Sequence, residues 1–149
     1  MTNRATCGAL GAALKAALAY FALVFACGFA LGAIRTFTLV PHIGELRAVI
    51  VELPLMLVAS WVASWWLVVR FSLGTAFVPR AVMGGLAFVL LQGAELALWR
   101  FIFGRSVAAF LRSFEEVPNL IGLFGQIAFA LIPMLQAALN YPRAHLPER

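Results

Sequence analysis

The sequence predicts an all-α, multi-pass membrane protein with four transmembrane helices in a single domain of residues 1–149. The first observation behind this prediction is composition. Of 149 residues, 64% are hydrophobic and 11% are charged, with a mean hydropathy of +0.98, whereas soluble domains are about 45–50% apolar and about 25% charged. The second is spacing, because four charge-poor runs of about 20 residues, enough to cross about 30 Å of hydrocarbon, occupy nearly the whole sequence.

The predicted helices follow these four runs and the turn residues between them. We expect helices at about 12–40, 48–70, 78–103 and 117–139. Pro41 with Gly44, and Gly74 with Pro79, mark the first two connections, because glycine and proline are the strongest local signals of a turn. Pro118 suits the first turn of the last helix, where the missing N–H has no helical partner to lose.

A short amphipathic helix is expected at about 105–116, between the third and fourth spans. Its apolar and charged residues fall on opposite faces at helical spacing. The apolar residues are Val107, Phe110, Leu111 and Phe114, and the charged residues are Arg105, Arg112 and Glu116. Beside membrane spans, such a helix is expected to lie in the interface. The alternative is that the segment prolongs the third helix beyond the headgroups.

Four spans would place both termini and the 70–80 connection on one side of a bacterial inner membrane. That side carries six Lys and Arg residues, and the opposite side carries five. The six are Arg4, Lys15, Arg70, Arg80, Arg143 and Arg149, and the five are Arg35, Arg47, Arg100, Arg105 and Arg112. Since cytoplasmic loops carry the excess of basic residues, we expect cytoplasmic N- and C-termini.

Small residues spaced four apart indicate where helices approach one another. Such pairs occur in the first three spans: Gly28 and Gly32, Ser60 and Ser64, and Gly93 and Ala97. Small residues permit close backbone contact in lipid, where the hydrophobic effect does not drive helices together. The pattern predicts a packed bundle and leaves open whether the contacts lie within one chain or between subunits.

Strongly polar residues are expected to gather within one half of the membrane, near the side that carries the 35–47 connection. The expected cluster comprises Arg35, Glu52, Gln92, Glu95, Arg100 and Gln126. We expect Arg35 to pair with Glu52 near the surface, with Glu95, Gln92 and Gln126 deeper. The cluster either links helices or lines a polar cavity for an ion, a proton or a ligand head group, since ionisable groups inside membranes are often functional.

Other chemistry finds little support in the sequence, and we expect no catalytic, metal-binding or cofactor-binding residues. His42 and His145 fall in a connection and the tail, so they offer no pair for haem, and with Cys7 and Cys27 they form no metal-ligand cluster. The net charge of +5 is scattered rather than gathered in a basic stripe, which argues against nucleic acid as a partner.

The runs GFALGAIRTFTLVPHIGELRAVIVELPLMLVASW and AELALWRFIFGRS resemble small four-helix bacterial inner-membrane proteins of uncharacterised function. That resemblance implies the fold and no activity. Arg47, Glu52 and Pro54 also resemble part of the second-helix signature of the membrane-associated eicosanoid and glutathione family. The spacing is shorter than in that family and its asparagine is missing, so we expect no glutathione-dependent enzyme.

Together these features predict a non-catalytic accessory, assembly or stabilising subunit that packs in the lipid bilayer against a larger membrane complex or another copy of itself. The alternative is a small oligomeric transporter or channel, coupled to ions or protons, with a polar cavity in one leaflet. The two functions differ in what they ask of Glu95: the first uses it as a structural contact, and the second as part of a pathway.

Overall fold

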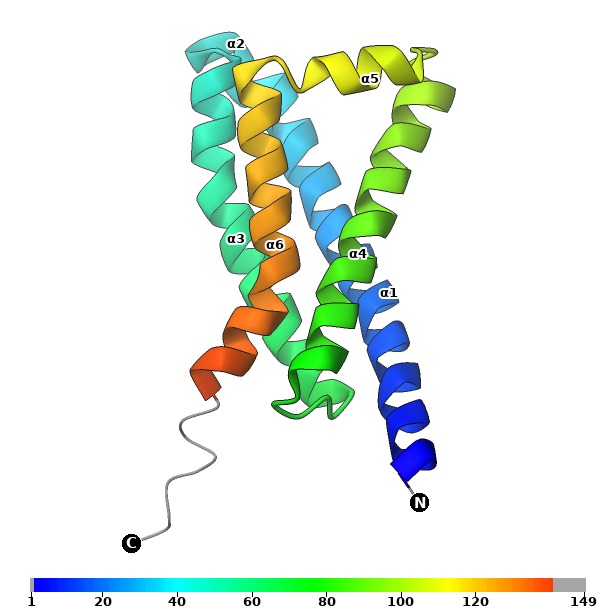
Figure 1. Ribbon diagram of the computed structural model, residues 1–149. Coiled ribbons are helices and arrows are strands. Elements are labelled where there is room, and N and C mark those ends of the chain that lie inside the picture. Colours follow the sequence, from blue (N-terminus) through cyan, green and yellow to red (C-terminus); the bar gives the residue numbers. More distant parts are fainter. Residues whose placement is uncertain (1, 141–149) are drawn as a thin grey trace, which may run out of the picture.

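Figure 1 shows the computed structural model, which describes the backbone of residues 2–140 and the side chains of residues 8–139. In chain order the elements are α1 (Thr2–Ile34), the π-helical segment η1 (Arg35–Leu39), α2 (Val40–Ile43), α3 (Glu45–Arg70), α4 (Phe77–Ala97), the π-helical segment η2 (Leu98–Ile102), α5 (Val107–Ser113) and α6 (Val117–Asn140). Within the described residues, four stretches are long and apolar enough to cross a membrane: Gly8–Ile43, Glu45–Arg70, Phe77–Ile102 and Val117–Leu139. The predicted four-helix membrane fold is confirmed.

The four long helices form a ring, because α1 and α6 each contact both α3 and α4. At one end of the bundle lie α2 and α5, and we call this the α5 end (Figure 1). At the opposite end lie the α3–α4 connection, the start of α1 and the end of α6, and we call this the loop end (Figure 1). The chain therefore crosses the bundle four times in alternating directions, as the sequence predicts.

Several boundaries differ from the prediction for local reasons. The first helix runs on through η1 and α2, and Pro41 is accommodated in the first turn of α2. Gly44, at a φ of 80° that favours glycine, then separates α2 from α3. α3 begins at Glu45 rather than near residue 48, and Pro54 lies inside this helix.

The segment between the third and fourth spans forms a shorter helix than expected. Gly104, at a φ of 65°, turns the chain after η2, and α5 begins after Ser106, whose hydroxyl accepts a hydrogen bond from the Ala109 N–H at 3.2 Å. Figure 1 shows α5 lying across the α5 end, at a steep angle to α4 and α6. Since Val107 and Leu111 are exposed, α5 presents apolar side chains where an interfacial helix would meet lipid.

The buried core lies in the half of the bundle nearer the loop end, which we call the packed half. Its fully buried large side chains include Tyr20, Leu67, Met83 and Pro133. At Gly84 a Cβ would lie 2.1 Å from the Ala130 carbonyl oxygen. The backbones of α4 and α6 therefore meet at this glycine, as close helix packing in membranes requires.

Pro133 and Tyr20 form a matched pair within the packed half. Proline has no N–H, so Pro133 leaves the Phe129 carbonyl, four residues earlier in α6, without its helical hydrogen bond. The Tyr20 hydroxyl donates to that carbonyl at 3.0 Å, and the Tyr20 and Phe129 ring centroids lie 4.6 Å apart. A side chain of α1 thus supplies the hydrogen bond that the proline removes from α6.

The packed half also holds polar groups that the prediction did not place there. The Ser64 hydroxyl donates to Gln136 Oε1 at 2.8 Å, and Gln136 Nε2 donates to the Trp61 carbonyl at 2.9 Å. Arg80, at 3% exposure, bonds the Gly74 carbonyl through Nε and Nη2, at 2.9 and 2.5 Å. The expectation that strongly polar residues lie only in the opposite half was therefore wrong.

The expected small-residue contacts divide into two groups. Ser60 and Ser64 are buried between helices, and a Cβ at Gly28 would lie 3.3 Å from Met56 Cε. At Gly32 and Gly93 nothing lies within 4 Å of an added Cβ, and Gly93 and Ala97 are both exposed. Gly93 and Ala97 make no such contact within the described bundle, because that face of α4 points outward. The prediction left open a contact between subunits, and for this pair it stays a prediction.

Candidate functional site

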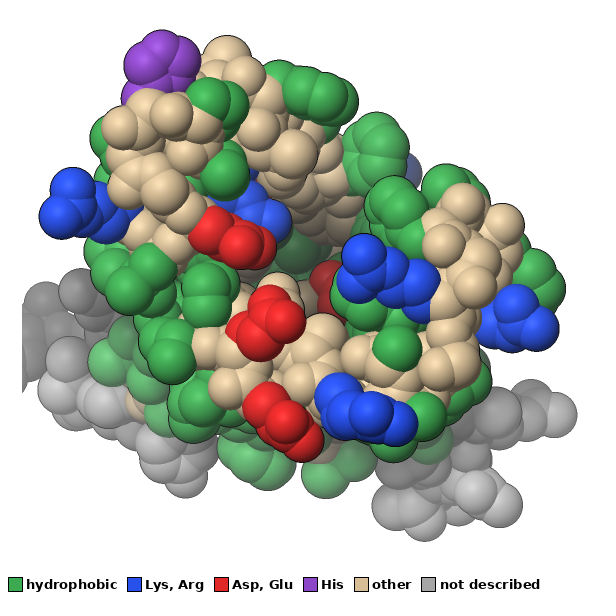
Figure 2. All heavy atoms as spheres, turned by 90° about the horizontal axis from the view of Figure 1, so that it is seen from above, with side chains coloured by type: hydrophobic (Ala, Val, Ile, Leu, Met, Phe, Trp, Pro, Cys, Tyr) green, Lys and Arg blue, Asp and Glu red, His purple; other side chains and the backbone are tan. Residues whose placement is uncertain are grey.

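A cavity of about 560 Å³ lies in the half of the bundle nearer the α5 end, which we call the hollow half. It is bounded by α1, η1, α3, α4, η2 and α6, and its deepest residues border the packed half. Figure 2 looks at the α5 end and shows a hollow between the helices, with acidic and basic side chains around it. The cavity therefore opens toward one side of the membrane.

Glycines explain why the helices do not fill this space. Four of them line the cavity: Gly28, Gly32, Gly122 and Gly125. At Gly32 and Gly122 nothing lies within 4 Å of an added Cβ, so these two positions leave open volume, whereas Met56 packs against Gly28 and Leu53 against Gly125. In addition, α4 and α6 touch at Gly84 in the packed half and lie farther apart at the α5 end (Figure 1).

The walls of the cavity are mainly apolar and include five aromatic rings. The rings belong to Phe25, Phe29, Phe37, Phe103 and Phe129. The polar lining residues are Arg35, Thr36, Glu52, Ser60, Glu95 and Gln126. A largely apolar cavity of roughly 300–1,000 Å³ with a few convergent polar groups is typical of small-molecule sites.

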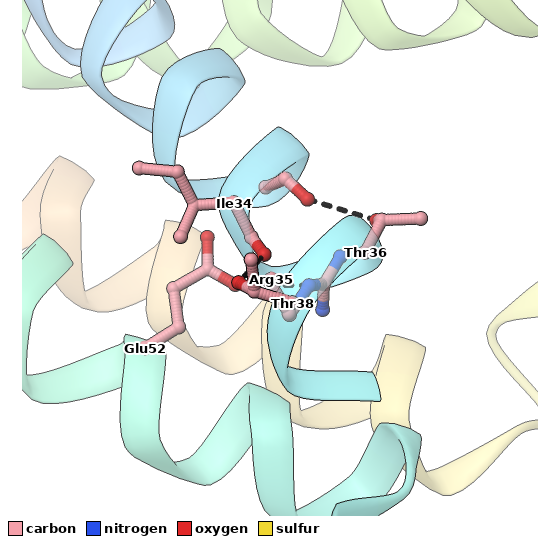
Figure 3. Close-up of polar contacts among 6 residues, drawn as sticks. Ile34, Arg35, Thr36, Thr38 and Glu52 are labelled. Atoms are coloured by element: carbon pink, nitrogen blue, oxygen red, sulfur yellow. Dashed lines mark hydrogen bonds and ion pairs between the residues drawn. The ribbon is translucent and has the colours of Figure 1, made fainter. Parts of the chain in front are cut away.

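Arg35 and Glu52 form an ion pair at the cavity, shown in Figure 3. Arg35 Nε lies 3.0 Å from Glu52 Oε2, and their side chains are 28% and 15% exposed. The Nε–H group does not meet hydrogen-bond geometry, so the contact is an ion pair rather than a directional hydrogen bond. It joins η1, within the first membrane span, to α3.

Glu52 lies deeper along its helix than the sequence analysis placed it. The earlier start of α3 at Glu45 puts Glu52 seven residues, or about 10 Å of helix, from that end. Glu95 lies a similar distance, about 10 Å, from the end of η2 at Ile102. The two carboxylates therefore enter the cavity at comparable depth from opposite walls, because α3 and α4 lie across the ring from each other.

Glu95 is held by a chain of two amides. Gln126 Nε2 donates to Glu95 Oε1 at 2.5 Å, and Gln92 Nε2 donates to Gln126 Oε1 at 2.5 Å. An ionised carboxylate only accepts hydrogen bonds, which orients the Gln126 amide and, through it, that of Gln92. The chain ties α4 to α6 and fixes the direction in which Glu95 faces the cavity.

The remaining residues of the expected cluster take different places. Gln92 donates a hydrogen bond to Gln126 and is not itself one of the residues that line the cavity. Arg100 lies in η2, is exposed, and has no hydrogen bond or ion pair with any side chain that the structure describes. Its expected place in the cluster was wrong, because Arg100 lies on an exposed part of η2 that no neighbouring helix covers.

Both π-helical segments lie at the cavity, a feature that the sequence analysis did not anticipate. η1 contributes Arg35, Thr36 and Phe37 to the lining, and η2 contributes Leu98. The Thr36 hydroxyl donates to the Gly32 carbonyl at 2.8 Å, and the Thr38 hydroxyl donates to the Ile34 carbonyl. The two hydroxyl groups donate to carbonyls close to the π-helical turn, which is wider than an α-helical turn. Such turns are frequent at functional sites. In the sequence, Thr36 and Thr38, which follow Gly32, are the feature that could have indicated this π-helical turn.

A second hollow, of about 420 Å³, lies beside α5. Arg105 stacks over the Trp99 ring at 4.8 Å from its centroid, and Arg112, Glu116 and Asn119 also line the hollow. Its basic and acidic side chains lie outside the first cavity. They therefore contribute no lining charge to the site formed by Glu52 and Glu95.

Among the described residues, no group of three or more His, Cys, Asp or Glu side chains is placed to hold a metal ion. His42 lies in α2 rather than in a loop, and its Nδ1 is 2.8 Å from the Thr38 carbonyl oxygen. Cys27 is exposed. His145 and the side chain of Cys7 lie outside the described residues.

Comparison with protein-family models, with curated proteins and with solved structures finds no match to this chain. No activity can therefore be transferred from a relative. What the chain does has to be argued from the cavity and its lining residues.

Proposed function

We propose that this chain is a small, non-catalytic membrane transporter that takes up its ligand in the cavity of the hollow half. The observation that carries the proposal is the cavity of about 560 Å³, open toward one end and lined by Glu52, Glu95 and Arg35. Charged groups are costly within a bilayer, by about 2.5–3.5 kcal/mol each on insertion scales. A cavity open to water reduces that cost and makes the same groups available to a ligand.

The lining residues support binding better than they support catalysis. Among the described residues that line the cavity there is no histidine or cysteine. Ser60 is the deepest hydroxyl group there, and the described partners of the two glutamates are Gln126 for Glu95 and Arg35 for Glu52, not Ser60. A nucleophile needs a base within hydrogen-bond reach, so the proposal assigns the glutamates to ligand binding.

The accessory-subunit role predicted from the sequence is the second candidate. The observation that favours it is the outward-facing small-residue surface at Gly93 and Ala97, which the bundle itself does not use. Another membrane helix could approach α4 closely there. Under this proposal the chain would pack against a larger membrane complex or against a second copy of itself.

We also propose a bacterial inner-membrane location with cytoplasmic N- and C-termini, so that the cavity opens on the opposite side. The support is the six-to-five distribution of Lys and Arg and the positive-inside rule. Of the six, Arg143, Arg149 and the side chain of Arg4 lie outside the described residues. Arg80 is buried and bonded to the Gly74 carbonyl.

The cavity can be tested with single cysteines on α3 in a variant carrying Cys7→Ala and Cys27→Ala. Leu57→Cys places a thiol in the cavity lining. Val58→Cys, its immediate neighbour, places one on an outward surface that is 63% exposed. A membrane-impermeant maleimide added to sealed vesicles of either orientation measures which thiols water can reach.

A transporter should expose its cavity to each side in turn. We expect Leu57→Cys to react rapidly from the α5-end side and more slowly from the loop-end side, while Val58→Cys, in lipid, reacts from neither. Reaction of Leu57→Cys from one side only would contradict transport, and no reaction from either side would contradict an open cavity. For the accessory role, purification in mild detergent should retain a stoichiometric partner that Gly93→Leu removes and Val58→Leu does not.

A further inference from the structure

The cavity carries unequal numbers of acidic and basic groups. Its lining contains two carboxylates, Glu52 and Glu95, and one guanidinium, Arg35. Because Arg35 pairs with Glu52 at 3.0 Å, it is already committed to one of the two. Glu95 receives its hydrogen bond from a neutral amide, that of Gln126. An ionised Glu95 would therefore give the cavity one negative charge with no balancing cation in its lining.

No other basic group of the described structure reaches this position. Arg100, the nearest along the chain, is exposed and lies outside the lining, as do Arg105 and Arg112 of the second hollow. An uncompensated charge in a low-dielectric site favours an oppositely charged partner. The charge of the cavity therefore selects a cation over an anion.

The walls indicate an organic cation rather than a metal ion. Metal cations such as Ca²⁺ and Mg²⁺ require six or more oxygen ligands, and most of the lining is apolar. Five phenylalanine rings instead offer surfaces for a hydrophobic body and for cation–π contact, which contributes about 0.5–2 kcal/mol depending on desolvation. The cavity volume of about 560 Å³ suits a molecule of drug size.

We propose that the ligand of this cavity is a lipophilic organic monocation, with its charge against the Glu95 carboxylate and its apolar groups against the phenylalanine walls. The inference rests on the proposed function, because it assigns a ligand class to the same cavity. Arg35 and Glu52 neutralise one another in the cavity wall, and Gln126 with Gln92 holds Glu95 in the direction of the ligand.

The test uses two probes that share a shape and differ in charge. Tetraphenylphosphonium is a lipophilic cation, and tetraphenylborate is the corresponding anion. Binding of each to the full-length protein in detergent is measured by equilibrium dialysis. We expect saturable binding of tetraphenylphosphonium at one site per chain, and no saturable binding of tetraphenylborate.

Two substitutions probe charge and space separately. Glu95→Gln removes the charge, keeps a group that can bond Gln126, and should weaken tetraphenylphosphonium binding at least about tenfold, as loss of a buried charge partner does. Gly32→Leu fills the cavity at a position where nothing lies within 4 Å of an added Cβ. It should also weaken binding about tenfold or more. Val58→Leu, on the outward surface, should leave binding unchanged.

The outcomes separate the ligand class from the cavity itself. Equal binding of both probes, or full affinity in Glu95→Gln, would overturn the proposed charge selection. If Glu95→Gln fails to elute as a folded species on gel filtration, unchanged affinity in Gly32→Leu would overturn the proposal instead. Absence of probe binding while Leu57→Cys is labelled from both sides would refute the ligand class and leave the proposed function intact. Absence of that labelling would refute the proposed function.

Discussion

The two halves of this bundle use the same four helices and differ in how their polar groups are satisfied. In the packed half, Tyr20, Ser64, Arg80 and Gln136 all donate hydrogen bonds to groups of the protein. In the hollow half, Glu95 has one amide partner and borders a cavity of about 560 Å³. The hydrogen bonds of the packed half stabilise the fold, whereas the Glu95 carboxylate in the hollow half can still accept hydrogen bonds from a ligand.

Glycine has opposite consequences in the two halves. At Gly84 the missing side chain lets two backbones touch, whereas at Gly32 it leaves open volume. Both are small residues on membrane helices, and the sequence pattern of small residues does not distinguish them. What separates them is whether the neighbouring helix has already been brought close by other contacts.

The largest effect should come from breaking the packed half at Gly84. Gly84→Ala would place a Cβ 2.1 Å from the Ala130 carbonyl oxygen, a backbone atom that cannot move aside alone. We expect a loss of about 3 kcal/mol or more in the free energy of unfolding. The measurement is unfolding in mixed micelles of increasing SDS content, followed by circular dichroism.

Gly93→Ala is the matched control for that substitution, on the same helix, since nothing lies within 4 Å of its added Cβ. We expect it to leave stability unchanged or to raise it by up to about 1 kcal/mol, because alanine favours helix. Equal stability of the two variants would show that α4 and α6 do not meet at Gly84.

The next effect concerns the hydrogen bond that crosses the packed half. Tyr20→Phe removes the donor to the Phe129 carbonyl, which should cost about 1–3 kcal/mol because the acceptor is buried. In a Pro133→Ala background, residue 133 regains an N–H for that carbonyl, so the same substitution should cost less. A double-mutant cycle should therefore give a coupling of about 1 kcal/mol. No coupling would mean that Tyr20 does not compensate for the proline.

The smallest expected effect is the difference in stability between two Gln→Leu substitutions in α6. Gln136→Leu leaves the buried Ser64 hydroxyl without its acceptor. Gln126→Leu frees Glu95 and Gln92, which are both partly exposed. We expect Gln136→Leu to be more destabilising by about 1 kcal/mol, measured in the same SDS titration. If Gln126→Leu costs as much, the hollow half depends on its polar contacts as strongly as the packed half does.

Parts of the site could be predicted from sequence because polar residues in apolar helices stand out and their depth follows from the helical rise. Arg35, Glu52, Glu95 and Gln126 were selected in this way, and all four line the cavity. Arg100 was misplaced because its sequence position gives its depth but not whether a neighbouring helix covers its side chain. Gln136 was missed because its partners, the Ser64 hydroxyl and the Trp61 carbonyl, belong to a helix 72 and 75 residues earlier in the chain.

The sequence alone determined the class of fold, the number of spans and their alternating directions, because these follow from hydropathy, length and turn residues along the chain. It also indicated which half of the membrane would hold the carboxylates. Only the tertiary structure decided which small residues touch and which leave a cavity, and which polar groups find partners. Those outcomes depend on the distance between helices, which is set by contacts between residues far apart in the chain, such as Gly84 with Ala130 and Tyr20 with Phe129.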